Sequence, residues 1–249
     1  MKLRRILATI KIQYINLIRS PAPLCMILLL PIVLVLLFSL MFGSVIIEGV
    51  GMSVFEFLIP GLYAFSGLFM AVPVSLSFSE DREQGLLKRI NTTPMTGTEF
   101  IGSHLLSNMT MSLIQVAIIA FLAFLMGYRG APEGIILAFV FMVIFSMSTI
   151  GFGLITATIA KSAKAAGGII QIFVLPQQLL ASGLYPLPSE VKVVSMFMPL
   201  HYVSDALTLL FSDVPLNDIR IWNDLLILII FSLVIISIGI LLFKKYGKT

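Results

Sequence analysis

The sequence has few charged residues and almost no cysteine. Asp, Glu, Lys and Arg make up 11% of its 249 residues, against about 25% in soluble domains. Hydrophobic residues make up 59%, and the mean hydropathy is +1.08. A water-soluble globule of this length needs more polar surface, which excludes a cytosolic enzyme and a disordered regulator. The single cysteine, Cys25, excludes a secreted disulfide scaffold. The composition therefore predicts an integral membrane protein.

The long apolar stretches also lack the residues that carry chemistry. None contains Asp, Glu, Lys or Arg, which ion-coupled carriers usually need at depth. His104 is alone in its stretch, and a lone histidine more often packs or caps than binds a ligand. His201 and Asp205 would share a helix face, but a metal site needs more ligands, so we expect a surface ion pair. The sequence thus predicts no catalytic, cofactor-binding or metal site, no ATP site and no nucleic-acid partner.

Six charge-free stretches are long enough to cross a bilayer as helices, which takes roughly 20 apolar residues. They cover residues 20–47, 57–79, 100–128, 134–160, 165–189 and 225–243. Of the 16 Lys and Arg residues, 13 fall on the side that holds both termini, while eight of the twelve acids fall on the other side. Because basic residues favour the cytoplasmic side, we expect an all-α protein with six spans and both termini in the cytoplasm.

The N-terminal segment precedes the first span. Its apolar residues recur at helical spacing, with basic residues on other faces. This pattern predicts an amphipathic helix in the inner headgroup layer. The alternative is a signal peptide with residues 24–42 as its apolar core, but that core is too long and no clean cleavage site follows it.

The loop after the second span carries acids first and bases last, an order that the helix dipole favours. Leu86, Leu87 and Ile90 would form a small apolar edge, and Pro94 would end the element. The commoner interpretation of such a run is an ordinary polar loop helix. A short helix fixed to spans at both ends could instead act as a lever for a soluble partner.

The fifth stretch is interrupted at Pro176 and followed, after Glu190 and Lys192, by an apolar piece over 193–200. Eight residues are too few to cross. We expect helices that dip into the outer leaflet and return, sheltered by protein; the alternative is an extracellular loop.

Small residues recur every four positions in two spans, which lets helix backbones approach closely. The contact could lie within one subunit or between two. The expected helix-packing residues are Gly67, Ala71 and Ser75 in one span and Thr149, Gly153 and Ala157 in the other.

Two motifs resemble the permease subunit of a type-2 ABC transporter, a class of exporters. Residues 80–94 are similar to the family's Glu-x-Gly, Leu-x-Arg-hydrophobic and Thr-Pro sequence. Residues 180–188 and 199–206 resemble its Ser-Gly-aromatic-Pro and Pro-Leu-x-Tyr segments. The family often has Arg a few residues later, where this chain has Leu209 and Leu210. The resemblance implies that Glu80, Glu83, Gly85, Leu86, Leu87, Arg89, Ile90 and Pro94 couple to an ATPase, and that Ser182, Gly183, Tyr185, Pro186, Pro188, Pro199 and Tyr202 form a re-entrant gate.

The resemblance also implies how the chain is divided. It would form a single transmembrane domain over 1–249. Its parts would be an interfacial elbow helix (1–23), spans 1 and 2 (24–79), a cytoplasmic coupling helix (80–96), spans 3 to 5 (97–189), a re-entrant outer segment (190–222), and span 6 with the cytoplasmic tail (223–249).

Partners and activity follow from the same resemblance. The chain would pair with a second copy or a similar permease in the plasma membrane of a prokaryote and bind two ABC ATPase subunits. ATP and Mg would bind to those subunits, and this chain would not be an enzyme. The short outer loop at 43–56 and the lack of a carbohydrate-stacking cluster favour a multidrug or lipid-like substrate. The alternatives are polysaccharide or lipid-linked glycan export and, more distantly, a membrane anchor or an intramembrane enzyme.

Overall fold

The computed structural model describes residues 2–19, 21–47, 53–85, 97–126, 132–180, 188–212 and 214–246. Within these ranges the regular structure is helical, apart from one isolated bridge between Ile46 and Ser53. The helices are α1 (Lys2–Arg19), α2 (Pro21–Leu24), a π-helical turn (Cys25–Leu29), α3 (Leu30–Phe42), α4 (Val54–Leu68), α5 (Ala71–Glu83), α7 (Gly97–Leu125), α8 (Pro132–Ile159), α9 (Ala163–Leu179), α10 (Ser189–Ser195), α11 (Pro199–Phe211) and α12 (Ile219–Tyr246).

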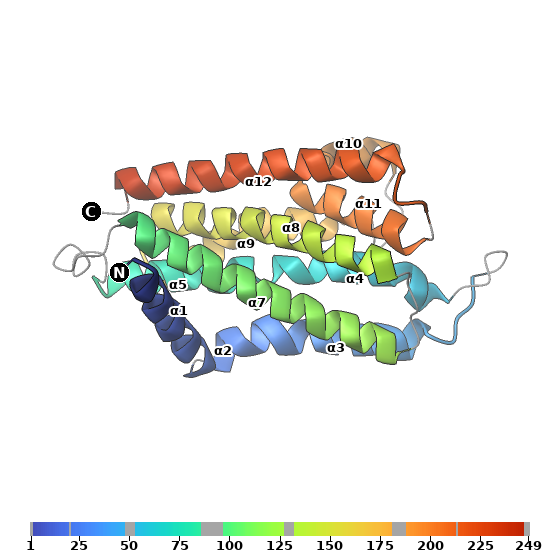
Figure 1. Ribbon diagram of the computed structural model, residues 1–249, viewed down its shortest axis with the longest axis horizontal. Helices are drawn as coiled ribbons and strands as arrows, with labels where there is room; N and C mark the ends of the chain where they lie inside the picture. Colours follow the sequence, from blue (N-terminus) through green and yellow to red (C-terminus); the bar gives the residue numbers. More distant parts are fainter. Residues whose placement is uncertain are drawn as a thin grey trace.

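Most helices lie side by side along the long axis of the molecule, as Figure 1 shows, while α1 lies obliquely at one end. The starts of α1, α7 and α9 share that end with the ends of α5, α8 and α12 (Figure 1). We call it the termini end. The opposite end carries α10 and α11, and we call it the bent-pair end.

Within the described ranges, four helical segments are long and apolar enough to cross a membrane: Val54–Glu83, Ile101–Leu122, Gly134–Ile159 and Ile219–Phe243. The pair α10–α11, bent by 111°, makes up to five. The first expected span forms a shorter apolar helix over Ile27–Phe42, and the fifth forms α9, which has 17 residues. The expectation of an all-helical membrane protein is confirmed, and the number six stays a prediction.

The second expected span is a broken helix, α4 followed by α5, and it lies at the centre of the bundle. Ser53 and Glu56 form a capping box at its start. The break falls at Phe69 and Met70, just before Pro73, which has no N–H to donate to the preceding turn. In its most apolar window, 89% of the residues are buried. This span therefore contacts protein on nearly all sides.

The core lies where α8 crosses its neighbours α5, α7, α11 and α12. Phe141, Phe145, Ile150 and Leu154 of α8 are fully buried. A polar bond stabilises the break in the second span, because Gln115 of α7 donates from Nε2 to the carbonyl oxygen of Ser66 at 2.8 Å. The outer faces of α3, α9 and α12 carry exposed apolar side chains.

The N-terminal helix forms as expected, but its sides are divided differently. Tyr14 lies against α7 and donates its hydroxyl to the Ser107 carbonyl at 3.5 Å, while Ile18 is exposed. Both belong to the apolar residues of the N-terminal segment that recur at helical spacing and were expected on one face. The helix has a protein-facing side and a second apolar side, formed by Ile12, Ile15 and Ile18, because α7 covers only part of it.

Candidate functional site

The expected coupling helix begins inside a span. Glu80 and Glu83 belong to the last turn of α5, which ends at a turn through Gln84 and Gly85. Gly85 has φ of 65°, the left-handed conformation that commonly ends helices at glycine. No breaker lies between Pro73 and Gly85, so the span continues to Glu83. Of the other coupling residues, Leu86, Leu87, Arg89, Ile90 and Pro94 lie outside the described residues.

The end of α5 contacts α7 through Asp81. Its Oδ2 lies 2.9 Å from His104 Nε2, and the imidazole is buried. Phe78, one turn earlier on α5, stacks on the same ring with centroids 4.3 Å apart. His104 is therefore a packing residue that joins two helices, as expected for a lone histidine.

The next residue, Arg82, contacts the end of α8. Its Nη1 donates to the Thr158 carbonyl at 3.0 Å, and its Nη2 donates to the Ala160 carbonyl. Glu83 contacts the start of α9, because its Oε1 accepts from the Ala163 amide at 2.8 Å. Glu83 was expected on the polar rim of an ATPase contact, whereas the structure turns it toward its own chain. Arg82 was not singled out from the sequence, since its partners are backbone groups about 80 residues away that leave no motif.

The two stripes of small residues meet within one chain. A Cβ added at Gly153 would lie 2.6 Å from Val74 Cγ1, and one at Gly67 would lie 2.8 Å from Phe145 Cδ1. Ser75 Oγ and Thr156 Oγ1 are hydrogen-bonded at 2.7 Å between α5 and α8. The other stripe residues, Ala71, Thr149 and Ala157, are all buried. These contacts bring the backbones of α5 and α8 close together.

The expected gate is described only in part. Ser182, Gly183, Tyr185 and Pro186 lie outside the described residues. Pro188 precedes α10, and Pro199 starts α11 after the turn at Met196. The apolar piece 193–200, expected in helices that dip into the outer leaflet and return, is divided between α10 and α11 because the chain turns there. Its place in the outer leaflet stays a prediction. The Tyr202 hydroxyl donates to the Met196 carbonyl at 2.7 Å and closes this bend.

His201 is buried and does not lie on the surface. Its Nδ1 lies 3.2 Å from Ser195 Oγ, and its Nε2 lies 3.6 Å from Asp205 Oδ2. The expected pair with Asp205 exists, but only 4% of His201 is exposed. The sequence could not show this, because burial results from α10 folding back onto α11. In the described part of the chain, no three His, Cys, Asp or Glu side chains gather as a metal site.

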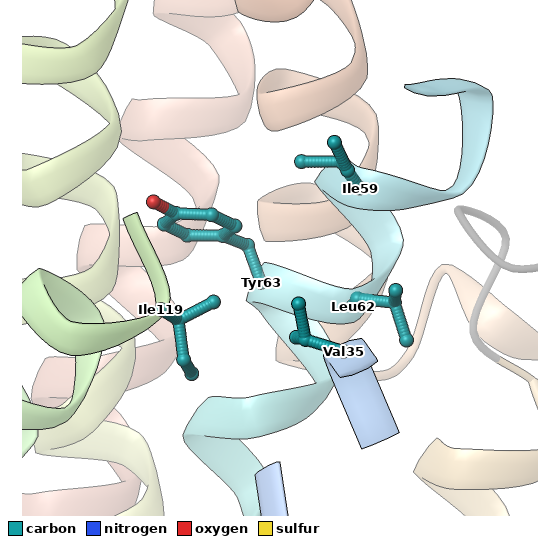
Figure 2. Close-up of a pocket in the computed structure, with 5 residues that line it drawn as sticks. All are labelled: Val35, Ile59, Leu62, Tyr63 and Ile119. Carbon is teal, nitrogen blue, oxygen red and sulfur yellow. The ribbon is translucent and has the colours of Figure 1, made fainter. Parts of the chain in front are cut away.

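A hollow between α3, α4 and α7 is lined by Val35, Ile59, Leu62, Tyr63 and Ile119 (Figure 2). It is apolar and has no room for a water molecule. Figure 2 shows the Tyr63 hydroxyl pointing away from Val35 and Leu62. This hollow is a packing gap and does not qualify as a binding pocket.

Comparisons with known proteins agree with the fold. The family model described as ABC-2 type transporter matches residues 4–212. A Cyanophora paradoxa protein named as transport permease ycf38 is 26% identical, over 99% of this chain and 90% of its own length. The daunorubicin resistance ABC transporter permease protein DrrB1 of Streptomyces coeruleorubidus is 24% identical, over 68% of this chain and 59% of its own length. The inner membrane transport permease YhhJ of Escherichia coli K12 is 28% identical, over 66% of this chain and 45% of its own length.

This chain therefore spans about half the length of the last two relatives and most of the first. The family model covers more than four fifths of the chain, across every helix from α1 to α11. The chain belongs to the ABC-2 type transporter family, as one of its multi-pass membrane permeases.

Proposed function

We propose that this chain is the membrane-spanning permease subunit of an ATP-driven exporter for lipophilic, drug-like or lipid-like molecules. Two permease copies, or one copy and a similar chain, would form the translocation pathway. Two ABC ATPase subunits would bind at the termini end and hold the ATP and Mg. Closure of these subunits would switch the pathway from inward- to outward-facing, with both termini in the cytoplasm and the complex in the plasma membrane.

The observation that carries this proposal is the course of the second span. The α4–α5 span is the most buried of the candidate spans, and its second part, α5, continues to Glu83 and ends in the turn at Gln84 and Gly85. Residues 86–94, the segment that we expect an ATPase to contact, follow directly. A push on that segment would therefore act on a helix that contacts α7, α8 and α9.

The pathway itself is best assigned to the outer surface of α9. This helix exposes Ile172, Leu175 and Leu179 together with Gly168, where an added Cβ would meet no atom within 4 Å. Gln171 and Gln178 are partly exposed among them. Glutamines in contact with lipid tails leave polar groups unpaired. A face that mixes apolar side chains with amides is better suited to line a passage between two permease copies than to contact lipid tails.

The substrate class follows from the same surface. Between Gly168 and Leu179 this surface is an apolar wall with a few amides and no ionisable side chain, which suits a lipophilic molecule with a small polar part. One relative is named for daunorubicin resistance. Daunorubicin is therefore a suitable probe.

The test uses the permease co-expressed with an ABC ATPase encoded next to it. We expect the two to co-purify and to move daunorubicin into inverted vesicles when ATP is supplied. The double variant Leu86→Asp/Leu87→Asp should release the ATPase, because burying one leucine is worth roughly 1.5–3 kcal/mol. Normal ATPase binding and normal transport in this variant would show that 86–94 is only a solvated loop.

A further inference from the structure

We propose that Arg82 and Glu83 are positioning residues that fasten the α8–α9 corner to the end of α5, so that the coupling segment and α9 move as one body. The inference rests on the proposed function, since it assigns the route by which motion at 86–94 reaches the pathway. The α8–α9 corner comprises residues 158–163, from the last turn of α8 to the first residue of α9. We call the set of contacts that Arg82 and Glu83 make to it the corner clamp.

Arg82 fits the end of α8 in both shape and charge. The last carbonyls of a helix have no partner inside the helix, and they carry the negative end of its dipole. The guanidinium of Arg82 donates to two of these carbonyls, those of Thr158 and Ala160. A guanidinium with two divergent donors holds such a pair in one orientation, which a single ammonium cannot do.

Glu83 fits the start of α9 in the opposite sense. The first amides of a helix lack partners and carry the positive end of the dipole. Glu83 accepts from the Ala163 amide, while Ser162 accepts from the Ala165 amide at 3.1 Å. Two neighbouring residues of α5 thus contact two helix ends of opposite polarity, on the two sides of one corner.

Contacts deeper in the bundle prevent α5 from sliding past this corner. Ser75 Oγ lies 2.7 Å from Thr156 Oγ1 and 3.4 Å from the Ala166 carbonyl, so it contacts both α8 and α9. Gly153 leaves no free space against Val74. The α5 helix is therefore held to its neighbours at two positions about two turns apart, at Ser75 and at the corner clamp. A tilt of α5 must therefore tilt α9 as well.

The consequence for transport is that α9 follows the ATPase without touching it. The α9 helix is short, with 17 residues, and its exposed face is the one assigned above to the pathway. Without the corner clamp, the ATPase would still bind residues 86–94 and hydrolyse ATP, but α9 would move less. The corner clamp would set the amount of transport per ATP, and the binding of the ATPase would not depend on it.

The experiment compares Arg82→Met/Glu83→Ala with matched variants in the full permease–ATPase complex. Glu83→Gln keeps the accepting oxygen. Lys161→Met and Lys164→Met each remove an exposed cation at the same corner. A cysteine at Leu175, introduced after Cys25→Ser, reports the motion of α9 through its rate of maleimide labelling with and without vanadate trapping. ATP hydrolysis and daunorubicin transport are measured on the same preparations.

We expect the clamp double variant to bind the ATPase and hydrolyse ATP, but to lose about tenfold in transport per ATP, within the range of typical coupling energies. Its labelling at position 175 should no longer change on trapping. Both lysine variants should behave as the parent, and Glu83→Gln, which keeps the oxygen that accepts from the Ala163 amide, should lose less than the double variant. An unchanged labelling response in the double variant, or an equal loss in the lysine variants, would overturn the inference.

A second measurement keeps the test decisive if the double variant folds poorly. A short thiol-specific cross-linker between Glu83→Cys and Ala163→Cys should restore the transport that Glu83→Cys alone loses, because the inference requires the clamp to stay closed. A cross-link that abolishes transport would overturn it. Failure of the proposed function looks different, since the parent complex would then hydrolyse ATP without moving daunorubicin.

Discussion

The two ends of the bundle are stabilised by different kinds of polar contact. At the termini end, Arg82 and Glu83 bond to groups 76 to 80 residues away. At the bent-pair end, His201 and Tyr202 bond to partners four to six residues away. Polar bonds therefore join separate helices at one end and close a single bend at the other.

This difference suggests a division of roles. Bonds between distant segments make several helices respond together when one is displaced. Local bonds keep α10 and α11 as one unit, which meets α4, α8 and α12 through apolar packing. We therefore expect the termini end to transmit motion between helices, and the bent-pair end to move as one rigid unit.

The largest expected effect concerns the sides on which the two ends lie. In a Cys25→Ser background, a cysteine at Lys164 should react with an impermeant maleimide only from the cytoplasm, and one at Val194 only from outside. Both positions are exposed. Labelling of both positions from the same compartment would contradict the expectation that the two ends lie on opposite sides of the membrane.

A large steric effect is expected where α5 meets α8. Gly153→Val would place carbon 2.6 Å from Val74 Cγ1 and 3.1 Å from the Ser75 amide. Overpacking of this kind costs about 1–3 kcal/mol. The free energy of unfolding of the purified permease should fall by that amount. Gly102→Val, in open space on α7, should change this free energy little. Equal losses in both variants would mean that helix propensity, and not contact, sets the cost.

A smaller pair of changes separates the two kinds of bond. Ser75→Ala removes a hydrogen bond between helices, worth about 0.6 kcal/mol and at most about 1.7 in membrane proteins. Tyr202→Phe removes the local bond to the Met196 carbonyl. In hydrogen–deuterium exchange, Ser75→Ala should raise exchange in α5, α8 and α9, and Tyr202→Phe only around residues 196–202. Raised exchange in α5 on Tyr202→Phe would contradict the division.

The smallest effect is expected at an exposed pair between α11 and α12. Hydrogen bonds from Arg220 lower the pKa of Asp218 from its ordinary 3.8 to about 2. A lowered pKa means that the pair stabilises the fold above about pH 4 and is lost as the pH falls through about 2. Between pH 5 and 8, wild type and Asp218→Asn should give parallel stability curves. Curves that diverge in that range would show that another titrating group depends on Asp218.

Composition and hydropathy predict the membrane class and the helical segments, because lipid leaves the backbone few alternatives to a helix. The small-residue stripes predict close helix contact, and Gly67 and Gly153 make it. The sequence does not show which helices meet. The contacts of Glu83 to α9 and of Arg82 to backbone carbonyls could therefore not be predicted, and the coupling of Glu83 to an ATPase stays a prediction. His201 was predicted on the surface because its burial depends on the bend between α10 and α11 around Met196, which hydropathy does not encode.

The most direct test of the central claim measures whether the end of α5 and the start of α9 stay together through the ATP cycle. Spin labels are placed at Gln84→Cys and Lys164→Cys, both exposed positions, in one permease copy of the full complex. Distances between the labels are measured by double electron–electron resonance and compared between nucleotide-free and vanadate-trapped states. We expect the distribution of distances between positions 84 and 164 to stay unchanged on trapping. Labels at Lys164→Cys in the two copies should change their separation. A shift of the distance between positions 84 and 164 on trapping would contradict it.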